Sequence, residues 1–397
     1  MKLLHLADLH IGKRVYEYSM LEEQKAALLQ AFRMAKEHQV DAVLIAGDVY
    51  DKTIPTVEGV KLFDTFLTAL KTKRIPTFII SGNHDSAERL SFGRHLFENA
   101  EIYLSGTYEE EILKKTLVDE FGEVDIYLLP FLKPQQIEVA EGEERPKDYT
   151  EAIQLVLSRL DINKNNRNIL VAHQFVGGGN SEPERTDSET QSVGGVDMVD
   201  YRVFEAFDYV ALGHLHGAQQ VGRETVRYAG SPVKYSFSEA RQVKSATLIT
   251  LGRKETAVGA GCGQLAATTD ITVEKLPFTP VHDMREIKGT LAQLISPEIL
   301  AESDPQDYMH ITLTDEEEIY DVFGKLRAVY PNLMALDFDN SRTKSEGAAA
   351  LTGEIMKNKT TIELFREFFE KQAGTKLSPM QEQIIEDIIE EKNSLPA

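Results

Sequence analysis

The sequence predicts an α/β fold in which buried strands alternate with amphipathic helices. Short, continuous apolar runs indicate strands covered on both faces, because a half-exposed strand would alternate apolar and polar residues. These runs cover residues 3–7, 42–46, 77–80 and 209–212. Apolar residues recur at helical spacing over 21–38 and 56–71, which indicates helices between the strands. With 397 residues, 42% of them hydrophobic, the chain is long enough for two or three domains.

Each predicted strand is followed by a motif rich in Asp, His and Asn. The motifs are Asp8-Leu9-His10, Gly47-Asp48-Val49-Tyr50-Asp51, Gly82-Asn83-His84-Asp85 and Gly213-His214-Leu215-His216. Residues i and i+2 of an extended segment point the same way, so Asp8 and His10 can reach one ion together, as can His214 and His216. Open α/β sheets build their sites at the carboxyl ends of their strands. The motifs therefore predict one metal site with enough ligands for two ions.

A fifth strand end adds another candidate ligand, because His173 closes the apolar run 168–172. Carboxylate, imidazole and amide ligands without a thiolate suit Mn²⁺, Fe²⁺ or Zn²⁺ in a catalytic site better than a structural zinc site. A carboxylate placed between two ions can bridge them, and Asp48 is the natural candidate. Two ions about 4 Å apart can clamp a phosphodiester and hold a hydroxide for in-line attack.

Other polar residues near the motifs are assigned supporting roles. His84 follows Asn83, a probable ligand, and is expected to be catalytic by stabilising charge or protonating the leaving oxygen. Asp51 and Asp85 are expected to support the ligands or to contact the substrate. The remaining histidines, His5 among them, are expected to be structural or on the surface. Four basic residues near the motifs are candidates for phosphate contact: Lys13, Arg14, Lys52 and Arg89.

The motifs, taken in this order, resemble those of the calcineurin-like metallophosphoesterases. Within that family, the chain is similar to the nuclease subunits of bacterial, archaeal and eukaryotic double-strand-break repair complexes, over most of its length. The resemblance implies a metallophosphoesterase β-sandwich flanked by helices, with a small α+β capping domain and C-terminal helices. It also implies two divalent ions, usually manganese. The implied ligand sets are Asp8, His10, Asp48 and His216 for one ion, and Asp48, Asn83, His173 and His214 for the other, with His84 catalytic.

The resemblance carries functional expectations as well. It implies a double-strand 3′–5′ exonuclease and a single-strand and hairpin endonuclease that acts with an SMC-like ATPase in DNA repair, recombination and replication. The expected assembly is a homodimer within a heterotetramer, and the basic residues near the motifs become candidates for DNA contact. The ligand set alone also fits a protein phosphatase or a nucleotide phosphodiesterase. A non-catalytic scaffold is disfavoured because the ligand set is complete.

Four segments are predicted along the chain. Residues 1–252 form the metallophosphoesterase nuclease domain, 253–270 an atypical loop or linker, 271–340 the α+β capping domain, and 341–397 a linker with helices that bind a partner. In the third segment, helices are expected over 284–296 and 316–330, and strands over 308–313 and 333–338. The apolar stripes of the last segment suit the partner's coiled coil, with packing on the capping domain as the alternative.

Composition narrows the class of protein further. The single cysteine, Cys262, excludes an intramolecular disulfide framework and fits the cytoplasm, and no apolar run reaches the length of a membrane span. The chain begins directly with a strand, so no signal peptide is expected. Its net charge of −21 is unfavourable for binding DNA. Firm DNA binding is therefore expected to need a local basic track and a partner.

Overall fold

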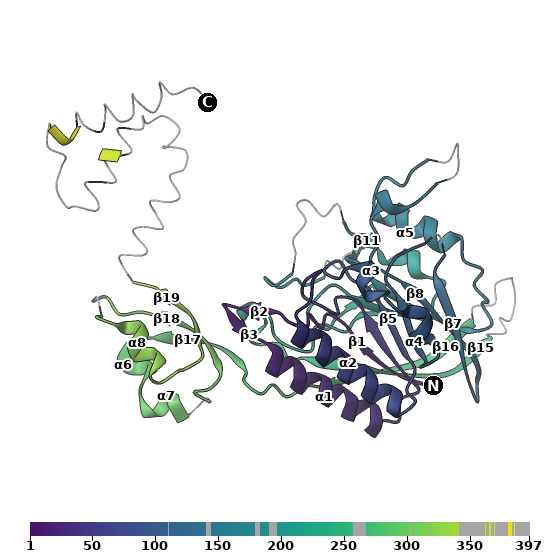
Figure 1. Cartoon of the computed structure of the whole chain (residues 1–397), viewed down its shortest axis with the longest axis horizontal. Helices are drawn as coiled ribbons and strands as arrows, with labels where there is room; N and C mark the ends of the chain where they lie inside the picture. The colour runs from purple at the N-terminus through teal and green to yellow at the C-terminus, as the bar shows by residue number, and fades with distance from the viewer. Residues whose placement is uncertain are drawn as a thin grey trace, which may run out of the picture.

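The computed structural model describes residues 1–109, 111–139, 144–178, 183–189, 197–256, 267–301, 304–317 and 319–340, with isolated positions beyond 340. Its main body contains two six-stranded sheets, with helices on the outer faces (Figure 1). A smaller lobe follows toward the C-terminus. The predicted α/β class and the implied β-sandwich flanked by helices are confirmed.

The first sheet has the order β16-β15-β1-β4-β5-β6. Its parallel strands are β1 (Lys2–Leu6), β4 (Ala42–Ala46), β5 (Thr77–Ile80) and β6 (Ile102–Ser105). The antiparallel strands are β15 (Ser245–Thr256), which pairs with β1, and β16 (Ala267–Pro277), which pairs with β15. Because β1, β4 and β5 run in the same direction, the residues that follow them meet at one edge.

The second sheet has the order β13-β14-β12-β9-β8-β7. Its parallel strands are β8 (Gly122–Leu129), β9 (Arg167–His173), β12 (Tyr209–Gly213) and β14 (Arg223–Tyr228). Antiparallel edges are formed by β7 (Leu113–Asp119) and β13 (Gln220–Val221). The carboxyl ends of β9 and β12 lie side by side, which brings His173 opposite Gly213 in the register.

Apolar side chains fill three layers of this body. Alternate residues of β4 explain why its apolar run is continuous: Leu44 packs between the two sheets, whereas Val43 and Ile45 pack against the outer helices. The middle layer joins such residues to their counterparts on the second sheet, for example Val171 and Ala211. Strands buried on both faces hold the chain firmly up to the residue at which each strand ends.

The helices cover the outer faces and confirm the predicted periodicity. Over the first sheet lie α1 (Leu21–Glu37) and α2 (Val57–Thr72), and α2 begins at Thr56, whose hydroxyl accepts the N–H of Gly59 at 3.1 Å. Over the second sheet lies α5 (Tyr149–Ser158). The remaining short elements are β2 (Arg14–Val15), β3 (Tyr18–Ser19), α3 (Ala87–Leu90), α4 (Arg94–Glu98), β10 (Val176–Gly177), β11 (Val199–Asp200) and the 3₁₀ turns η1 (Pro134–Gln136), η3 (Tyr201–Phe204) and η4 (Phe237–Glu239).

The smaller lobe has a parallel sheet in the order β17-β18-β19 (Figure 1). Its strands are β17 (Met284–Gly289), β18 (Tyr308–Leu313) and β19 (Leu333–Phe338), and its helices are α6 (Leu291–Leu294), α7 (Pro297–Ala301) and α8 (Val322–Arg327). The predicted strands 308–313 and 333–338 are confirmed. The helix predicted over 284–296 is limited to α6, because 284–289 pairs with β18, a partner that local periodicity cannot reveal. The helix predicted over 316–330 is limited to α8.

The predicted boundary at 252 and the loop at 253–270 also require correction. β15 continues to Thr256 and pairs with β16 from Ser245↔Pro277 to Thr256↔Ala267. The described residues of 253–270 therefore belong to two paired antiparallel strands, and 271–277 belongs to the first sheet rather than to the smaller lobe. The Gly-, Ala- and Thr-rich composition hid these strands because it lacks an apolar alternation. Residues 257–266, including Cys262, lie outside the described residues.

The linker and helices predicted over 341–397 lie outside the described residues, apart from isolated positions. Among the helices that the structure describes, none has the length and hydrophobicity that crossing a bilayer requires.

His5 links the two sheets through its ring, as a structural histidine. Its Nδ1 lies 3.2 Å from the Tyr209 hydroxyl and its Nε2 lies 3.2 Å from the carbonyl oxygen of Leu212. The residue is fully buried, and burial lowers the pKa of His5 from 6.5 to about 3. The neutral ring can thus donate to Leu212 and accept from Tyr209.

We predict that His5→Gln makes the stability of the fold less sensitive to mild acid. Below about pH 6.5 the unfolded chain binds a proton at His5 that the folded chain does not, so the wild type loses about 1.4 kcal/mol per pH unit from this residue until the folded pKa is reached. Urea unfolding with a chelator, at about pH 7 and about pH 5, should show a loss about 2 kcal/mol smaller in the variant. The exposed His95 provides the control, His95→Gln. Equal losses in all three proteins would contradict this.

Candidate metal centre

The carboxyl ends of five strands from the two sheets meet at one site. β1 is followed by Asp8 and His10, β4 by Asp48, and β5 by Asn83. On the second sheet, β9 ends at His173 and β12 is followed by His214 and His216. The structure therefore brings together all seven residues that were predicted as ligands, although they span more than two hundred positions of the chain.

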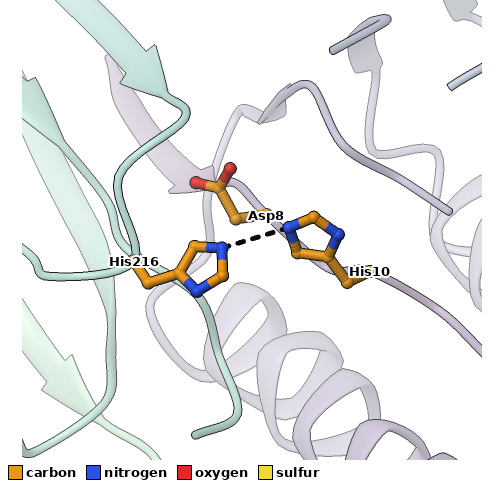
Figure 2. A group of neighbouring side chains, drawn as sticks. All are labelled: Asp8, His10 and His216. Carbon is orange, nitrogen blue, oxygen red and sulfur yellow. Dashed lines mark hydrogen bonds between the residues drawn. The ribbon is translucent and has the colours of Figure 1, made fainter. Parts of the chain in front are cut away.

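One half of the cluster joins the first motif to the last. Nε2 of His10 lies 3.1 Å from Nε2 of His216, and Asp8 lies beside both rings (Figure 2). Asp8 Oδ1 accepts the backbone N–H of His214 at 2.9 Å, whereas its buried Oδ2 has no hydrogen-bond donor among the described residues. Two imidazole nitrogens and a free carboxylate oxygen thus converge.

The other half of the cluster centres on Asn83. Its Oδ1 lies 3.1 Å from Nε2 of His173 and 3.0 Å from Nδ1 of His214. Nδ1 of His173 lies 2.8 Å from the carbonyl oxygen of Ala46, to which it can donate, so Nε2 is left with its lone pair toward the cluster. The amide oxygen and two imidazole nitrogens can therefore face one cation.

Asp48 lies between the two halves. Its Oδ2 is 3.6 Å from Nε2 of His10 and 3.4 Å from Nε2 of His173, while its Oδ1 accepts the backbone N–H of His84 at 2.9 Å. The carboxylate thus has one oxygen held by the backbone and one directed at ring nitrogens of both halves. This is the placement that a bridging ligand requires.

The chemistry of these donors fits divalent ions. Asp8, His10, Asp48, His173 and His216 are almost completely buried, so water cannot readily solvate their lone pairs. Oxygen and nitrogen donors are present and sulfur is absent, as catalytic Mn²⁺, Fe²⁺ or Zn²⁺ sites prefer. Asn83, His84 and His214 are only half-buried and form the accessible edge of the cluster.

The electrostatics of the cluster show the same need for positive charge. Burial raises the pKa of Asp8 well above its ordinary value, and the charge of Asp48 adds to this effect although His173 opposes it. For His173, burial alone would lower the pKa, but Asp48 and Asp8 outweigh it and raise the pKa to about 9. The two carboxylates thus favour positive charge at this position.

The backbone at the strand ends adopts conformations that the sequence did not reveal. Asp8, His10, Asp48 and His214 all have positive φ, at 51°, 42°, 49° and 107°. Such conformations are unfavourable for residues other than glycine, by roughly 1 kcal/mol or more each. Four strained residues in one cluster are a feature of functional sites, where the surrounding core holds the side chains in place.

The other predicted residues occupy distinct places around the cluster. Asp51 binds Lys13 at 2.8 Å. Its Oδ1 lies 3.8 Å from Nδ1 of His10, which is too far for a hydrogen bond, and that ring nitrogen has no hydrogen-bond partner among the described residues. Asp85 accepts three backbone N–H groups, from Val49, Tyr50 and Gly82, at 2.9–3.0 Å. It braces the loops after β4 and β5 and is not placed as a substrate contact.

The four candidate DNA contacts differ in their availability. The charge of Lys13 is already compensated by Asp51 and the residue is only half-exposed. Arg14 is exposed and its guanidinium donates to the carbonyl oxygen of Glu17. Lys52 and Arg89 are exposed on the surface.

Sequence reasoning missed the residues behind His216. Ser188 Oγ lies 2.7 Å from Nδ1 of His216, and Glu189 Oε1 accepts the backbone N–H of His216 at 2.7 Å. Glu239 lies behind Ser188 and pairs with Lys244. No apolar run precedes Ser188 or Glu189, and the segment that contains them is polar. The neighbouring sequence contains no pattern that distinguishes these residues from ordinary surface side chains.

We predict that Gly47→Ala disrupts metal binding through His173. Gly47 has a φ of +84°, and an added Cβ would lie 2.3 Å from Nδ1 of His173. Displacement of this ring should weaken Mn²⁺ binding by about tenfold or more, measured by equilibrium dialysis. Gly122→Ala is the control, since Gly122 also has a positive φ, +111°, but nothing within 4 Å of an added Cβ. Equal metal affinities in the two variants would show that His173 does not depend on this contact.

Comparison with known families agrees with the geometry. The family model described as calcineurin-like phosphoesterase matches residues 1–218, and the model described as type 5 capsule protein repressor C-terminal domain matches residues 280–373. Among solved structures, a dimetal phosphatase from Danio rerio is 12% identical and covers 70% of this chain and 99% of its own, at a TM-score of 0.38. A likeness at that level adds nothing to the assignment.

Two curated relatives match nearly the whole chain. The SbcD component of the SbcCD nuclease from Staphylococcus epidermidis is 32% identical over 355 residues, which cover 87% of this chain and 88% of the relative. The protein of the same name from Staphylococcus saprophyticus is 31% identical over 350 residues, 86% of this chain and 87% of the relative. The predicted enzyme class, a hydrolase of phosphodiester bonds, is thereby confirmed. The chain belongs to the calcineurin-like phosphoesterases and, within them, to the SbcD family of nuclease subunits.

Proposed function

We propose that this chain is a two-metal DNA nuclease. The observation that carries the proposal is the buried cluster around Asp48, in which side chains from five strand ends direct oxygen and nitrogen lone pairs at one another. Kinship with the SbcD nuclease subunits supports a nucleic acid as the substrate. The alternatives, a protein phosphatase or a nucleotide phosphodiesterase, share the ligand chemistry but not this kinship.

The ligand assignment follows the two halves of the cluster. Asp8, His10, Asp48 and His216 would hold one ion, and Asp48, Asn83, His173 and His214 the other. Manganese is the proposed metal. When bound, the two ions supply the charge that polarises a phosphodiester and the acidity that yields hydroxide near neutral pH. The chain's own contribution is to fix these donors in a buried, rigid arrangement and to leave one edge open to the substrate.

His84 is proposed as the catalytic residue at that edge. Its backbone N–H is bound to Asp48, and its Nδ1 lies 3.1 Å from the carbonyl oxygen of Asp51. If Nδ1–H donates to that carbonyl, Nε2 is left for the substrate. From there the ring can stabilise charge on the phosphate or donate a proton to the leaving oxygen. Its half-buried position keeps it accessible while the loop contacts hold its orientation.

The finer activities and the assembly are proposed from kinship. The proposed activities are a 3′–5′ exonuclease on duplex ends and an endonuclease on single strands and hairpins. The chain would act in DNA repair, recombination and replication in the cytoplasm. The proposed partner is an SbcC-type SMC-like ATPase, bound through 341–397. The net charge of −21 supports this, because a negatively charged chain needs a partner to bind DNA firmly. The proposed assembly is a homodimer within a heterotetramer.

A nuclease assay tests the proposal directly. Hairpin DNA and blunt duplex DNA would be incubated with the purified chain and Mn²⁺, with and without the ATPase and ATP. We expect manganese-dependent hairpin cleavage that chelation abolishes, and duplex degradation that requires the ATPase. Cleavage of a phosphopeptide or a cyclic nucleotide, with no cleavage of either DNA, would favour the alternative functions.

We predict that Asp48→Asn removes metal and activity together. The amide keeps the shape of the side chain but loses the charge shared by both halves of the cluster. Removal of residues that merely support a ligand costs about 10–100-fold, so loss of the bridge should cost more than about 100-fold in cleavage rate and reduce the bound manganese. Metal analysis and the hairpin assay measure the two effects. Asp64→Asn, on an exposed face of α2, is the matched control. Full activity in Asp48→Asn would remove the bridging role.

We predict that His84→Ala loses cleavage activity but keeps its metal ions. Cleavage should fall by about 10²–10⁴-fold, the range expected for loss of a general acid or base, while both ions stay bound. Manganese content and single-turnover cleavage would be compared with those of His95→Ala, which alters an exposed histidine of α4. If His84→Ala lost an ion in parallel with its activity, His84 would have to be reassigned as a ligand.

A further inference from the structure

Every polar atom of His216 except Nε2 is held by a neighbour. Its backbone N–H donates to Glu189 Oε1 at 2.7 Å, and its carbonyl oxygen accepts from Lys244 Nζ at 2.9 Å and from the backbone N–H of Ser231 at 3.1 Å. Its Nδ1 lies 2.7 Å from Ser188 Oγ. Only Nε2 remains, and it points into the cluster toward His10 (Figure 2).

The contacts behind Nδ1 of His216 determine whether this nitrogen donates or accepts its hydrogen bond. Ser188 Oγ lies 2.5 Å from Glu239 Oε1, and Glu239, fully buried, has Lys244 at 2.5 Å from its other oxygen. A carboxylate paired with a lysine has no proton to give, so it accepts from the serine hydroxyl. The serine oxygen must then accept from His216, which places the ring proton on Nδ1. In that tautomer Nε2 carries the lone pair that a metal ion needs.

Glu239 is itself held in place from outside the site. It lies on η4, where the Phe237 ring packs 5.1 Å from the His310 ring of the smaller lobe. Lys234 Nζ binds both the carbonyl oxygen of Ala240, at 2.6 Å, and Asp283 at 2.7 Å, next to β17. The carboxylate therefore sits on a short turn fixed by two lobes, which suits a residue that must orient another side chain.

We propose that Glu239 and Ser188 are positioning residues, which fix the tautomer of His216 and so present Nε2 to the metal. This inference rests on the proposed function, in which His216 is a ligand. Lys244 compensates the buried charge of Glu239 and secures the backbone of His216. Ser188, Glu239 and Lys244 act through His216 and not by contact with the substrate.

The experiment measures metal affinity and the tautomer separately. Mn²⁺ binding to the full chain would be followed by calorimetry for the wild type, Ser188→Ala, Ser188→Thr, Glu239→Gln and His216→Ala. The metal-free proteins would give the protonated nitrogen of His216 from ¹H–¹⁵N correlation spectra of the histidine rings. Glu224→Gln, on an exposed position of β14, is the control for a general effect of charge.

We expect Ser188→Ala and Glu239→Gln to weaken the binding of one of the two Mn²⁺ ions by about 10–100-fold, as loss of a residue that supports a metal ligand does in other proteins. The wild-type ring should be protonated at Nδ1 and lose that preference in both variants. Ser188→Thr keeps a hydroxyl and should restore both properties. Glu239→Gln leaves Lys244 buried without its partner and could prevent folding. In that case Ser188→Ala, which changes a half-buried residue, provides the decisive test.

The outcomes separate this inference from the ligand assignment. If His216→Ala loses an ion while Ser188→Ala keeps wild-type affinity and the Nδ1–H tautomer, the positioning role is wrong and the ligand role stands. If His216→Ala binds both ions as the wild type does, His216 is not a ligand and the positioning role fails with it.

Discussion

Two buried carboxylates, Asp8 and Asp48, impose the constraint on which the rest of the site depends. Neither is exposed by more than 2%, and each has one oxygen bound to a backbone N–H and lies close to imidazole nitrogens. A buried negative charge is unfavourable unless positive charge lies close to it. The raised pKa of His173 is one response to that requirement, and two divalent ions are the proposed one. The surrounding imidazoles and Asn83 then serve as the neutral donors that complete each half.

The double-sided burial of the strands explains how the site tolerates its backbone strain. Asp8, His10, Asp48 and His214 have positive φ directly after strands whose side chains are packed between two layers. The packing energy of those strands is spread over the whole core, whereas the strain is confined to the few residues at their ends. A single sheet with one solvated face would hold these turns less firmly. The stacked sheets thus bring the motifs together and also keep them rigid.

Sequence alone predicted the parts of the molecule that rest on local patterns. The apolar runs of β1, β4, β5 and β12 and the stripes of α1 and α2 are recognisable because their period reflects burial directly. The seven candidate ligands could be selected because each follows such a run. Their roles remain predictions, but their meeting at one edge follows from parallel strands having their carboxyl ends on the same side.

Features that depend on distant partners could not be predicted in this way. The segment 284–289 has apolar spacing that suits a helix, and only its pairing with β18 makes it a strand. The parts of β15 and β16 beyond the core lack an apolar alternation, and they are strands because they pair with each other. Ser188, Glu189 and Glu239 lie in polar segments, and they acquire a role only when folding places them behind His216. Sequence patterns locate groups that bind a ligand directly more readily than the groups that orient them.

The proposed mechanism requires that two metal ions share Asp48. Crystals of the chain grown with Mn²⁺ and measured at the manganese absorption edge test it most directly. We expect two anomalous peaks about 4 Å apart on either side of the Asp48 carboxylate, one beside His10 and His216 and one beside His173 and His214. A single peak, or two peaks that do not flank Asp48, would contradict it.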